Sequence, residues 1–310
     1  MLQRSSSILK LAILSLAAAW AMPAAARDIY VNNVAGDDLF DGTSPQSNDP
    51  HEGPFKTLRR ALKAANAGDR IILARNDEPY RESVSLVGSF HSGSSSFPFI
   101  IEGQGAIFDG TKEVNPDAWQ FVSGDTFRFQ PERKQYQILY LDGVPALRKP
   151  APTEPGRLPD LEPREWATIG GYIYFRVEHG RLPQEYNLRY THLPAAITLY
   201  KVEGVIIHDL VLQGYALDGV NMHDTRGPCL LSGLNCRGNA RSGVAVVGAA
   251  KGDLSACLLA DNGLCQVLVE GYSGCNLSSC DVIGTSAPKW KIGQNSELRI
   301  DGQPVDTKQD

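Results

Sequence analysis

The sequence predicts an all-β fold, a single-stranded parallel β-helix with an N-terminal capping helix and a β-rich insertion. Short β-type runs recur in the second half of the chain, and they begin at Ile197, Val220, Val244 and Val267. The spacings are 23, 24 and 23 residues, and no helical stripe lies between the runs. A constant period of this size indicates a solenoid, in which each unit buries its apolar side only against its neighbours.

A second column inside the repeat supports the same stacking. We expect it to contain Leu210, Leu234, Leu258 and Cys280, with small and turn-forming residues between the strands. Residues one period apart would then become neighbours in rungs about 4.8 Å apart. Residues 196–290 therefore form the main body of the predicted solenoid.

Residues 1–26 predict a cleaved secretory signal peptide. Arg4 and Lys10 provide a basic start, an apolar run extends from Leu11 to Met22, and the small residues 24–26 precede a cleavage point. A membrane anchor is the alternative, but it needs a longer apolar span. No other stretch is apolar enough to cross a bilayer, so we expect a secreted or periplasmic protein without a membrane span.

The charge balance argues against nucleic acid as a partner. Without Arg4 and Lys10 the chain carries 28 basic and 35 acidic side chains, a net charge of −7. A mildly acidic surface does not attract phosphate backbones, although it allows a local basic cleft. The length of the chain allows one elongated domain with a modest insertion, and we expect a monomer.

The N-terminal part, residues 27–111, predicts a cap and the first rungs. A strand at 28–31 is followed by a polar loop and then by a segment in which Leu58, Ala61, Leu62 and Ala65 share one helical face. Thr57 is the expected N-cap and Gly68 the expected stop. A solenoid must cover its first rung, and this amphipathic helix is a suitable lid.

Two motifs in this part carry a resemblance to a known family. The run GDDLFDGTSP, followed by GPFKTLRRALKAANAGDRIIL, resembles the N-terminal signature of secreted right-handed parallel β-helix proteins of the pectate-lyase-like superfamily. The resemblance implies right-handed winding and covers most of the chain outside 112–195. It is specific for architecture, because the superfamily includes lyases, hydrolases, epimerases and non-catalytic surface proteins.

The period breaks over residues 112–195, which are rich in proline and aromatic residues. Segments such as 119–121, 127–129 and 172–175 alternate in the manner of antiparallel strands. We expect a β-rich insertion that packs as a flap on one side of the solenoid. After the repeats, residues 291–310 are short and polar and predict a C-terminal cap or tail.

All six cysteines lie between residues 229 and 280. Cys229 and Cys275 share a column two rungs apart, about 10 Å, which is too far for a disulfide. We therefore expect small buried thiols that fill the core. Cys265 is placed in a turn as the most exposed thiol, and a local Cys257–Cys265 bridge is left open. The spacings do not resemble a zinc site.

Side chains of one outer column are the first candidates for chemistry. Alternation places Tyr200, His223, Val247 and Glu270 on the outer side of successive rungs. Neighbouring turns and strand positions add further polar groups: Asp218, Asn221, Asp224, Arg226 and Arg241. We expect these residues to share one cleft.

This set predicts removal of a proton next to a uronate carboxylate, the first step of β-elimination in an acidic polysaccharide. Such a step needs a base, for which His223 or Tyr200 is the candidate, and a cation, for which Arg226 or Arg241 is the candidate. The segment YALDGVNMHDTRG resembles the Tyr/Asp/His cluster of the mannuronan epimerases. The remaining candidates are predicted to contact substrate: Asp218, Asp224, Glu270, Asn221 and Trp166.

Two other functions stay open. A glycoside hydrolase would use Asp218 and Asp224 as paired carboxylates, and a non-catalytic solenoid would only bind glycans or sit on the cell surface. Structural roles also compete, because aspartate is common in turns and Tyr200 can stack on a neighbouring rung. The sequence contains no phosphate-binding loop, GxSxG or HExxH motif.

Two further clusters have both a functional and a structural interpretation. The acidic loop ahead of the cap helix could hold Ca²⁺ or simply form turns, and its residues are Asp37, Asp38, Asp41, Asp49 and Glu52. No other metal or cofactor is predicted. Trp166, with Trp119, Tyr172 and Tyr174, could stack on sugar rings or form the small core of the insertion.

Overall fold

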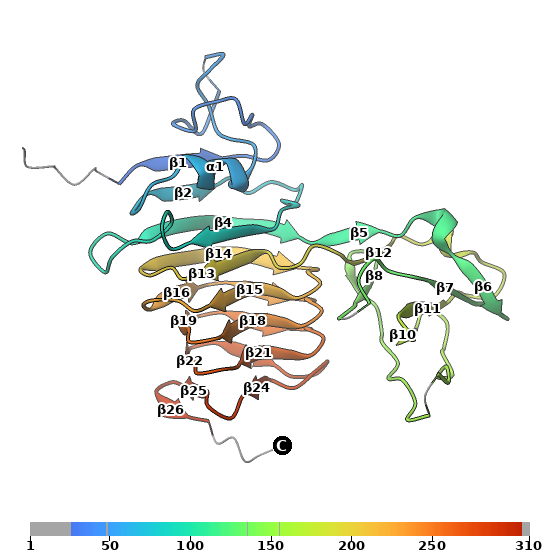
Figure 1. The fold of residues 1–310 in the computed structure, drawn as a ribbon. Helices are drawn as coiled ribbons and strands as arrows, with labels where there is room; N and C mark the ends of the chain where they lie inside the picture. The colour runs from blue at the N-terminus through green and yellow to red at the C-terminus, as the bar shows by residue number, and fades with distance from the viewer. Residues whose placement is uncertain (1–25, 48, 135, 155, 306–310) are drawn as a thin grey trace, which may run out of the picture.

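The computed structural model describes residues 26–47, 49–134, 136–154 and 156–305, and the predicted signal peptide lies almost entirely outside these ranges. The chain winds into a right-handed parallel β-helix from which an insertion projects to one side (Figure 1). The predicted fold class is confirmed.

One sheet of 12 strands runs along the full length of the solenoid. In four successive rungs this sheet bends at a residue with positive φ: Asp209 (57°), Gly233 (62°), Ala256 (52°) or Ser279 (52°). This bend divides the sheet into two faces. Its strands are β1 (Asp28–Val31), β2 (Arg70–Leu73), β4 (Phe99–Asp109), β14 (Val205–Gln213), β16 (Cys229–Ser232), β17 (Asn235–Arg237), β19 (Lys251–Ser255), β20 (Leu258–Ala260), β22 (Gly274–Ser278), β23 (Asp281–Ile283), β25 (Glu297–Ile300) and β26 (Gln303–Pro304).

A second sheet of six strands closes the other side of the solenoid. Val220 pairs with Ile197 above it and Val244 below it, and Val244 pairs with Val267, so the predicted repeat is the observed register. All four side chains are fully buried in the central core. The strands, in chain order, are β3 (Val84–Val87), β13 (Ile197–Tyr200), β15 (Asp218–His223), β18 (Ser242–Val247), β21 (Cys265–Val269) and β24 (Trp290–Ile292).

The second predicted column is correct in part. Val211 pairs with Asn235, which places Leu210 above Leu234. Asn235 pairs with Leu258, so the residue beneath Leu234 is Cys257. Cys257 is 2% exposed and faces the core, whereas Leu258 is half-buried on the other side of its strand. The prediction of Leu258 in this column is wrong, because the rung from Gly233 to Ala256 has 23 residues, one fewer than the 24 residues from Asp209 to Gly233.

The cap contains one short helix, α1 (Leu58–Ala64). The Thr57 side chain accepts a hydrogen bond from the Arg60 amide, so the predicted N-cap is confirmed. The Glu82 carboxylate accepts hydrogen bonds from the amides of Leu58 and Arg59 and satisfies two more orphan donors of the first turn. Buried residues of α1 close the apolar end of the solenoid: Leu58, Ala61 and Leu62.

The insertion consists of two four-stranded antiparallel sheets with their own core. It is attached to the solenoid at the turn after β17, where Ala240 joins the insertion core and the Tyr140 hydroxyl donates to the Gly238 carbonyl at 2.8 Å. Its elements are β5 (Thr111–Glu113), η1 (Pro116–Ala118), β6 (Gln120–Ser123), β7 (Thr126–Phe129), β8 (Leu139–Leu141), β9 (Val144–Pro145), β10 (Trp166–Ile169), β11 (Tyr172–Arg176), η2 (Pro183–Glu185) and β12 (Leu188–Thr191).

The cysteine predictions need two corrections. Cys265 lies inside β21 and is 0% exposed, so it is not the most exposed thiol. It also packs in a small cluster with Ala245 and Leu268 on the outer side of the six-stranded sheet, while Cys257 belongs to the central core. A Cys257–Cys265 bridge is therefore excluded by the opposite sides on which the two thiols lie.

Candidate functional site

The candidate site lies on the outer face of the six-stranded sheet. Tyr200 pairs with Val87 above it and His223 below it, and His223 pairs with Val247. Glu270 directly follows β21 and is exposed in the next rung. The predicted outer column is therefore continuous, with the side chains of Tyr200, His223 and Glu270 exposed to solvent.

His223 is oriented by its sequence neighbour. The Nδ1 atom of His223 lies 3.1 Å from Oδ2 of Asp224, and the Tyr200 ring centroid lies 5.6 Å from the imidazole. Asp224 has a φ of 51°, and its Oδ1 atom accepts a hydrogen bond from the Ala249 amide at 2.9 Å. The carboxylate is thus held from the rung below, and it holds the ring so that Nε2 is left for a substrate.

Two cations lie at the same end of this sheet. Lys201 follows Tyr200 with a φ of 55°, and its Nζ atom is 5.0 Å from the Tyr200 ring centroid. Arg226 is exposed in the turn after β15 and has no ion-pair partner among the residues that the structure describes. The sequence analysis missed Lys201. The rung period marks residues inside strands, whereas Lys201 lies just after β13, where the backbone turns with a positive φ.

Asp218 and Arg241 lie at the opposite end of the sheet. β15 runs from Asp218 to His223, five steps of about 3.3 Å, so their backbones are about 16 Å apart. Arg241 therefore does not share a reacting position with His223, and Asp218 is not paired with Asp224 across a cleft. The expectation that all these residues line one compact cleft is wrong, because they come from both ends of the same strands.

Asp218 is a buried ion-pair partner rather than a surface ligand. Its side chain is 0% exposed and accepts from Arg241 Nε at 3.0 Å, Ser242 Oγ at 2.6 Å and Asn221 Nδ2 at 3.0 Å. Burial opposes the charge on Arg241, but the hydrogen bonds and charge of Asp218 outweigh it and raise the pKa of Arg241. The predicted contacts of Asp218 and Asn221 with substrate are replaced by these internal contacts.

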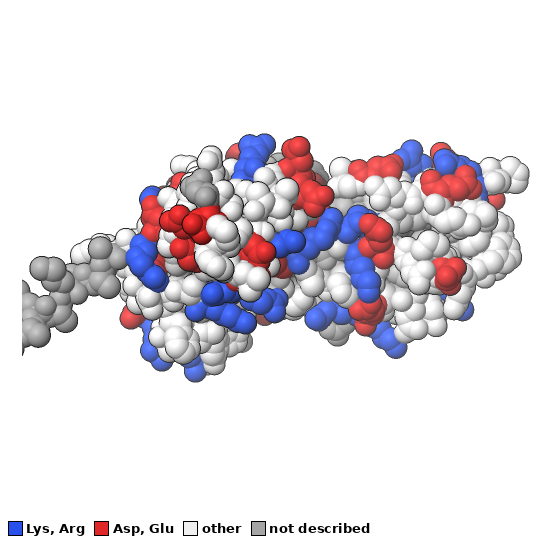
Figure 2. All heavy atoms as spheres, turned by 90° about the horizontal axis from the view of Figure 1, so that it is seen from above, with Lys and Arg blue, Asp and Glu red and all other residues white. Residues whose placement is uncertain are grey.

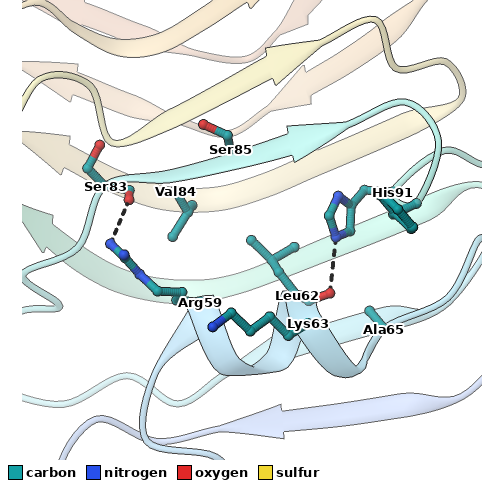
Figure 3. Close-up of a pocket in the computed structure, with 9 residues that line it drawn as sticks. Arg59, Leu62, Lys63, Ala65, Ser83, Val84, Ser85 and His91 are labelled. Carbon is teal, nitrogen blue, oxygen red and sulfur yellow. Dashed lines mark hydrogen bonds between the residues drawn. The ribbon is translucent and has the colours of Figure 1, made fainter.

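A pocket of about 550 Å³ opens beside the cap helix at the top of the same face. Figure 3 shows Arg59 of α1 reaching toward Ser83 of the neighbouring segment, with Lys63 beside it on the helix, and Arg59 donates to the Ser83 carbonyl at 3.2 Å. Ser85 pairs with Thr198, which pairs with Asn221. Ser85, on the edge of the pocket, therefore lies two rungs above Asn221 in the strand that ends at His223.

His91 joins the α1 side of this pocket to the end of β3. Its Nδ1 atom accepts from the Val87 amide at 3.0 Å, and Nε2 lies 3.0 Å from the Leu62 carbonyl, which requires a proton on Nε2. Burial lowers the pKa of His91. Next to it, the Phe90 ring is 65% exposed and offers an apolar surface at the mouth of the pocket.

A separate groove of about 540 Å³ lies between the insertion and the solenoid, with Arg148 and Arg237 on its walls. Trp166 contributes to its floor but is 1% exposed. The indole Nε1 donates to the Ala146 carbonyl at 2.9 Å, and the Arg148 guanidinium covers the ring at 5.3 Å. The prediction that Trp166 stacks on a sugar is wrong, because the ring belongs to the insertion core.

The acidic loop ahead of α1 uses its carboxylates to form turns. Asp38 accepts from the amides of Lys56 and Thr57, and Asp41 accepts from the Thr43 amide and hydroxyl. Within the described part of the chain, no group of three or more His, Cys, Asp or Glu side chains is arranged to hold a metal ion. The loop geometry is accounted for by these hydrogen bonds.

The charged surface is mixed. In the view from above, Figure 2 shows acidic and basic side chains interspersed over the cap end and the insertion. The described residues include no helix that is both long and apolar enough to span a membrane.

Comparisons with known proteins support the architecture. No family model and no curated protein matches this chain. A solved structure described as "Glycoside hydrolase" is 11% identical, with a TM-score of 0.59, over 82% of this chain and 73% of that chain. XylC in complex with xylose has 13% identity, a TM-score of 0.41 and coverage of 88% and 69%. Pectate lyase Pel9A has 10% identity, a TM-score of 0.42 and coverage of 88% and 62%. The likeness to the first of these structures, at 11% identity, concerns the fold alone.

Proposed function

We propose that this protein acts on an acidic polysaccharide by lyase-type proton abstraction at the Tyr200–His223 end of the outer face. One observation carries the proposal: the His223 imidazole is oriented by Asp224, with 3.1 Å between Nδ1 and Oδ2, and lies beside the Tyr200 ring. An oriented imidazole with a free Nε2 is suited to general-base catalysis near neutral pH.

In this mechanism the neutral imidazole removes the proton from the ring carbon next to a uronate carboxylate. The electron pair of that C–H bond forms a carbon–carbon double bond, and the glycosidic carbon–oxygen bond breaks. The Tyr200 hydroxyl supplies a proton to the leaving oxygen. The imidazolium then releases its proton to solvent and the phenolate takes one up, which restores both groups. Lys201 or Arg226 stabilises the charge that develops on the carboxylate.

The pocket beside α1 extends the proposed binding surface toward the cap. From the Ser85 strand to the His223 strand there are two rung spacings, about 10 Å. A polymer that crosses the rungs would place one acidic unit near Lys63 and Arg59 while another unit lies at His223. The exposed Phe90 ring provides a surface for the apolar side of a sugar.

The test is an incubation of purified protein with a panel of uronate polymers while ultraviolet absorbance of the unsaturated product is followed. His223→Ala should reduce the rate about 100-fold or more. His179→Ala is the matched control, because His179 is 97% exposed in the insertion, far from this face along the fold. Equal rates for wild type and His223→Ala would contradict the proposed role of His223.

A non-catalytic glycan-binding solenoid is the second candidate. It is favoured by the openness of the face, since the side chains of His223 and Asp224 are 47% and 35% exposed. Calorimetric titration with the same polymers separates the two candidates, because binding without any unsaturated product supports the second. A hydrolase that uses Asp218 and Asp224 is not proposed, since about 16 Å or more of strand exceeds the separation of roughly 5–10 Å that paired carboxylates need.

The proposal also places the protein outside the cytoplasm as a monomer, in keeping with the predicted signal peptide. Fractionation of cells that express the full chain tests the location, and N-terminal sequencing of the mature protein tests cleavage near residue 26. Light scattering of the mature protein tests the oligomeric state.

A further inference from the structure

Cys257 and Cys280 occupy the same position in two successive rungs. Leu258 pairs with Asp281, and the Asp281 amide donates to the Cys257 carbonyl at 2.8 Å. Each cysteine directly follows a left-handed bend residue, Ala256 or Ser279. The Cys257 amide also lies 3.4 Å from the Sγ atom of Cys280, so the lower thiol points up toward the upper rung.

The backbone geometry at this position suits a disulfide. Directly paired residues of adjacent parallel strands are about 4.8 Å apart, inside the range of about 4.4–6.8 Å between Cα atoms of a disulfide. Both side chains lie on the same side of the sheet, since Cys257 belongs to the central core and Cys280 packs against it.

The other cysteines do not share this arrangement. Cys229 and Cys275 both pair with Gly252, which separates them by two rungs, about 10 Å. Cys236 pairs with Leu259, and Cys265 lies on the outer side of the six-stranded sheet. Of all the cysteines in this chain, only Cys257 and Cys280 are stacked in adjacent rungs on one face.

We infer that Cys257 and Cys280 are an oxidation site, and that they form an inter-rung disulfide in an oxidising compartment. The oxidant is a disulfide, such as oxidised glutathione or a thiol–disulfide oxidoreductase. The Cys280 thiolate attacks one sulfur of that disulfide, forms a mixed disulfide and releases the first donor thiolate. The Cys257 sulfur loses its proton and displaces the second donor thiolate, so two protein thiols are oxidised and one donor disulfide is reduced.

The two thiols differ in reactivity in the order that the two exchange steps require. Hydrogen bonds from Cys257 to the Cys280 sulfur lower the pKa of Cys280, and the side chain is partly exposed. The same contact, together with burial, raises the pKa of Cys257. Burial raises the pKa of Cys229 to about 11 and of Cys275 to about 12. Cys280 is therefore the thiol that an external disulfide reaches first.

The bond would close one complete turn of the solenoid near its C-terminal end. Beyond Cys280 the 12-stranded sheet continues only through β23, β25 and β26, so this end has few rungs to hold it. A covalent link between rungs limits the loss of the last turn, because the two strands cannot separate while the bond is intact. The inference is independent of the proposed function at His223.

The experiment uses the mature protein equilibrated in a glutathione buffer of oxidising composition. Free thiols are alkylated under denaturing conditions, and the protein is digested without reduction by proteases that cut before aspartate and after glutamate. Cuts before Asp253, Asp261 and Asp281 and after Glu270 place Cys257, Cys265 and the Cys275/Cys280 pair on three different peptides. The expected product links the first and third peptides, and fragmentation assigns the bond to Cys280.

Thermal unfolding provides the second measurement. Reduction should lower the Tm of the oxidised protein by about 5 °C or more, whereas Cys280→Ser should unfold at one temperature with or without reductant. Cys275→Ser is the matched control and should keep the reductant-dependent shift. The inference would be overturned by six alkylated cysteines in the oxidised wild-type protein, or by a linkage to Cys265 or Cys275. Both results come from the wild type and do not depend on whether the variants fold.

Discussion

The Asp218 carboxylate is completely enclosed and is bound by Arg241, which lies one rung below it, with 3.0 Å between Nε and Oδ1. Ser242 and Asn221 complete the hydrogen bonds of the carboxylate. The pair thus ties two rungs together at the end of the outer face nearest the insertion. It also keeps the guanidinium, which is 19% exposed, in one orientation on that face.

We expect Asp218→Asn to destabilise the protein. The substitution leaves a largely buried guanidinium without its counter-charge, and loss of one partner of such a pair costs about 2–4 kcal/mol after allowance for the exposed part of Arg241. Chemical denaturation measures the change in the free energy of unfolding. Arg299→Gln, which removes an exposed ion pair with Glu297, is the control and should change it by less than about 1 kcal/mol. A similar small effect for Asp218→Asn would show that the pair contributes little.

We expect Lys63→Glu to weaken binding of an acidic oligosaccharide. Lys63 lines the pocket beside α1, and reversal of its charge should raise the Kd about three- to tenfold at low salt, with a smaller effect at about 0.5 M salt. Isothermal titration gives both values. The control is Lys251→Glu, an exposed change on the 12-stranded sheet. If both variants bind equally well, the pocket does not belong to the binding surface.

We expect stability to fall as the pH drops below about 6.5. Burial lowers the pKa of His91 in the folded protein, so the unfolded chain takes up this proton first as the pH falls. Neutral His91 makes its full contribution to the free energy of unfolding above about pH 6.5. This contribution is lost as the pH falls toward the lower pKa of His91 in the folded protein, with a slope of up to about 1.4 kcal/mol per pH unit. A proton on Nδ1 would also face the Val87 amide, which donates to that atom.

Denaturation midpoints between about pH 5 and pH 8 test this dependence. His91→Gln should flatten the slope in that window, while His179→Gln, which changes an exposed histidine, should leave it as in the wild type. An unchanged slope in His91→Gln would assign the acid sensitivity to other groups.

We expect Tyr140→Phe to loosen the insertion. The buried hydroxyl donates to the Gly238 carbonyl at 2.8 Å, and its removal leaves that carbonyl without this donor, at a cost of about 1–3 kcal/mol. Hydrogen exchange should accelerate in β8 and in the turn after β17, while the six-stranded sheet keeps its protection. Tyr272→Phe, at a 77% exposed residue, is the control. If Tyr140→Phe keeps the protection of the wild type in all of these segments, apolar packing around Ala240 is sufficient to hold the insertion on the solenoid.

Most of the architecture was predictable because its signals are local. The offsets between Ile197, Val220, Val244 and Val267 are the rung length itself, and alternation within each strand placed Tyr200 and His223 on the outside. Thr57 and the apolar face that begins at Leu58 identified the cap helix in the same way. The candidate site was predicted less well, because Asp218 begins the strand that His223 ends, and the length of that strand, about 16 Å, keeps the two groups apart.

By itself, the sequence determined the stacking of the rungs, the cap, the insertion and the outer column that holds His223, since period and side-chain alternation are visible along the chain. The right-handed winding was implied by the family resemblance. Only the tertiary structure decided that Arg241 belongs to Asp218, that Trp166 belongs to the insertion core and that Cys257 lies directly above Cys280. The last pairing depends on the 23-residue spacing of the left-handed bends at Ala256 and Ser279, and the first two depend on charge and apolar surface that are buried only when distant segments pack together.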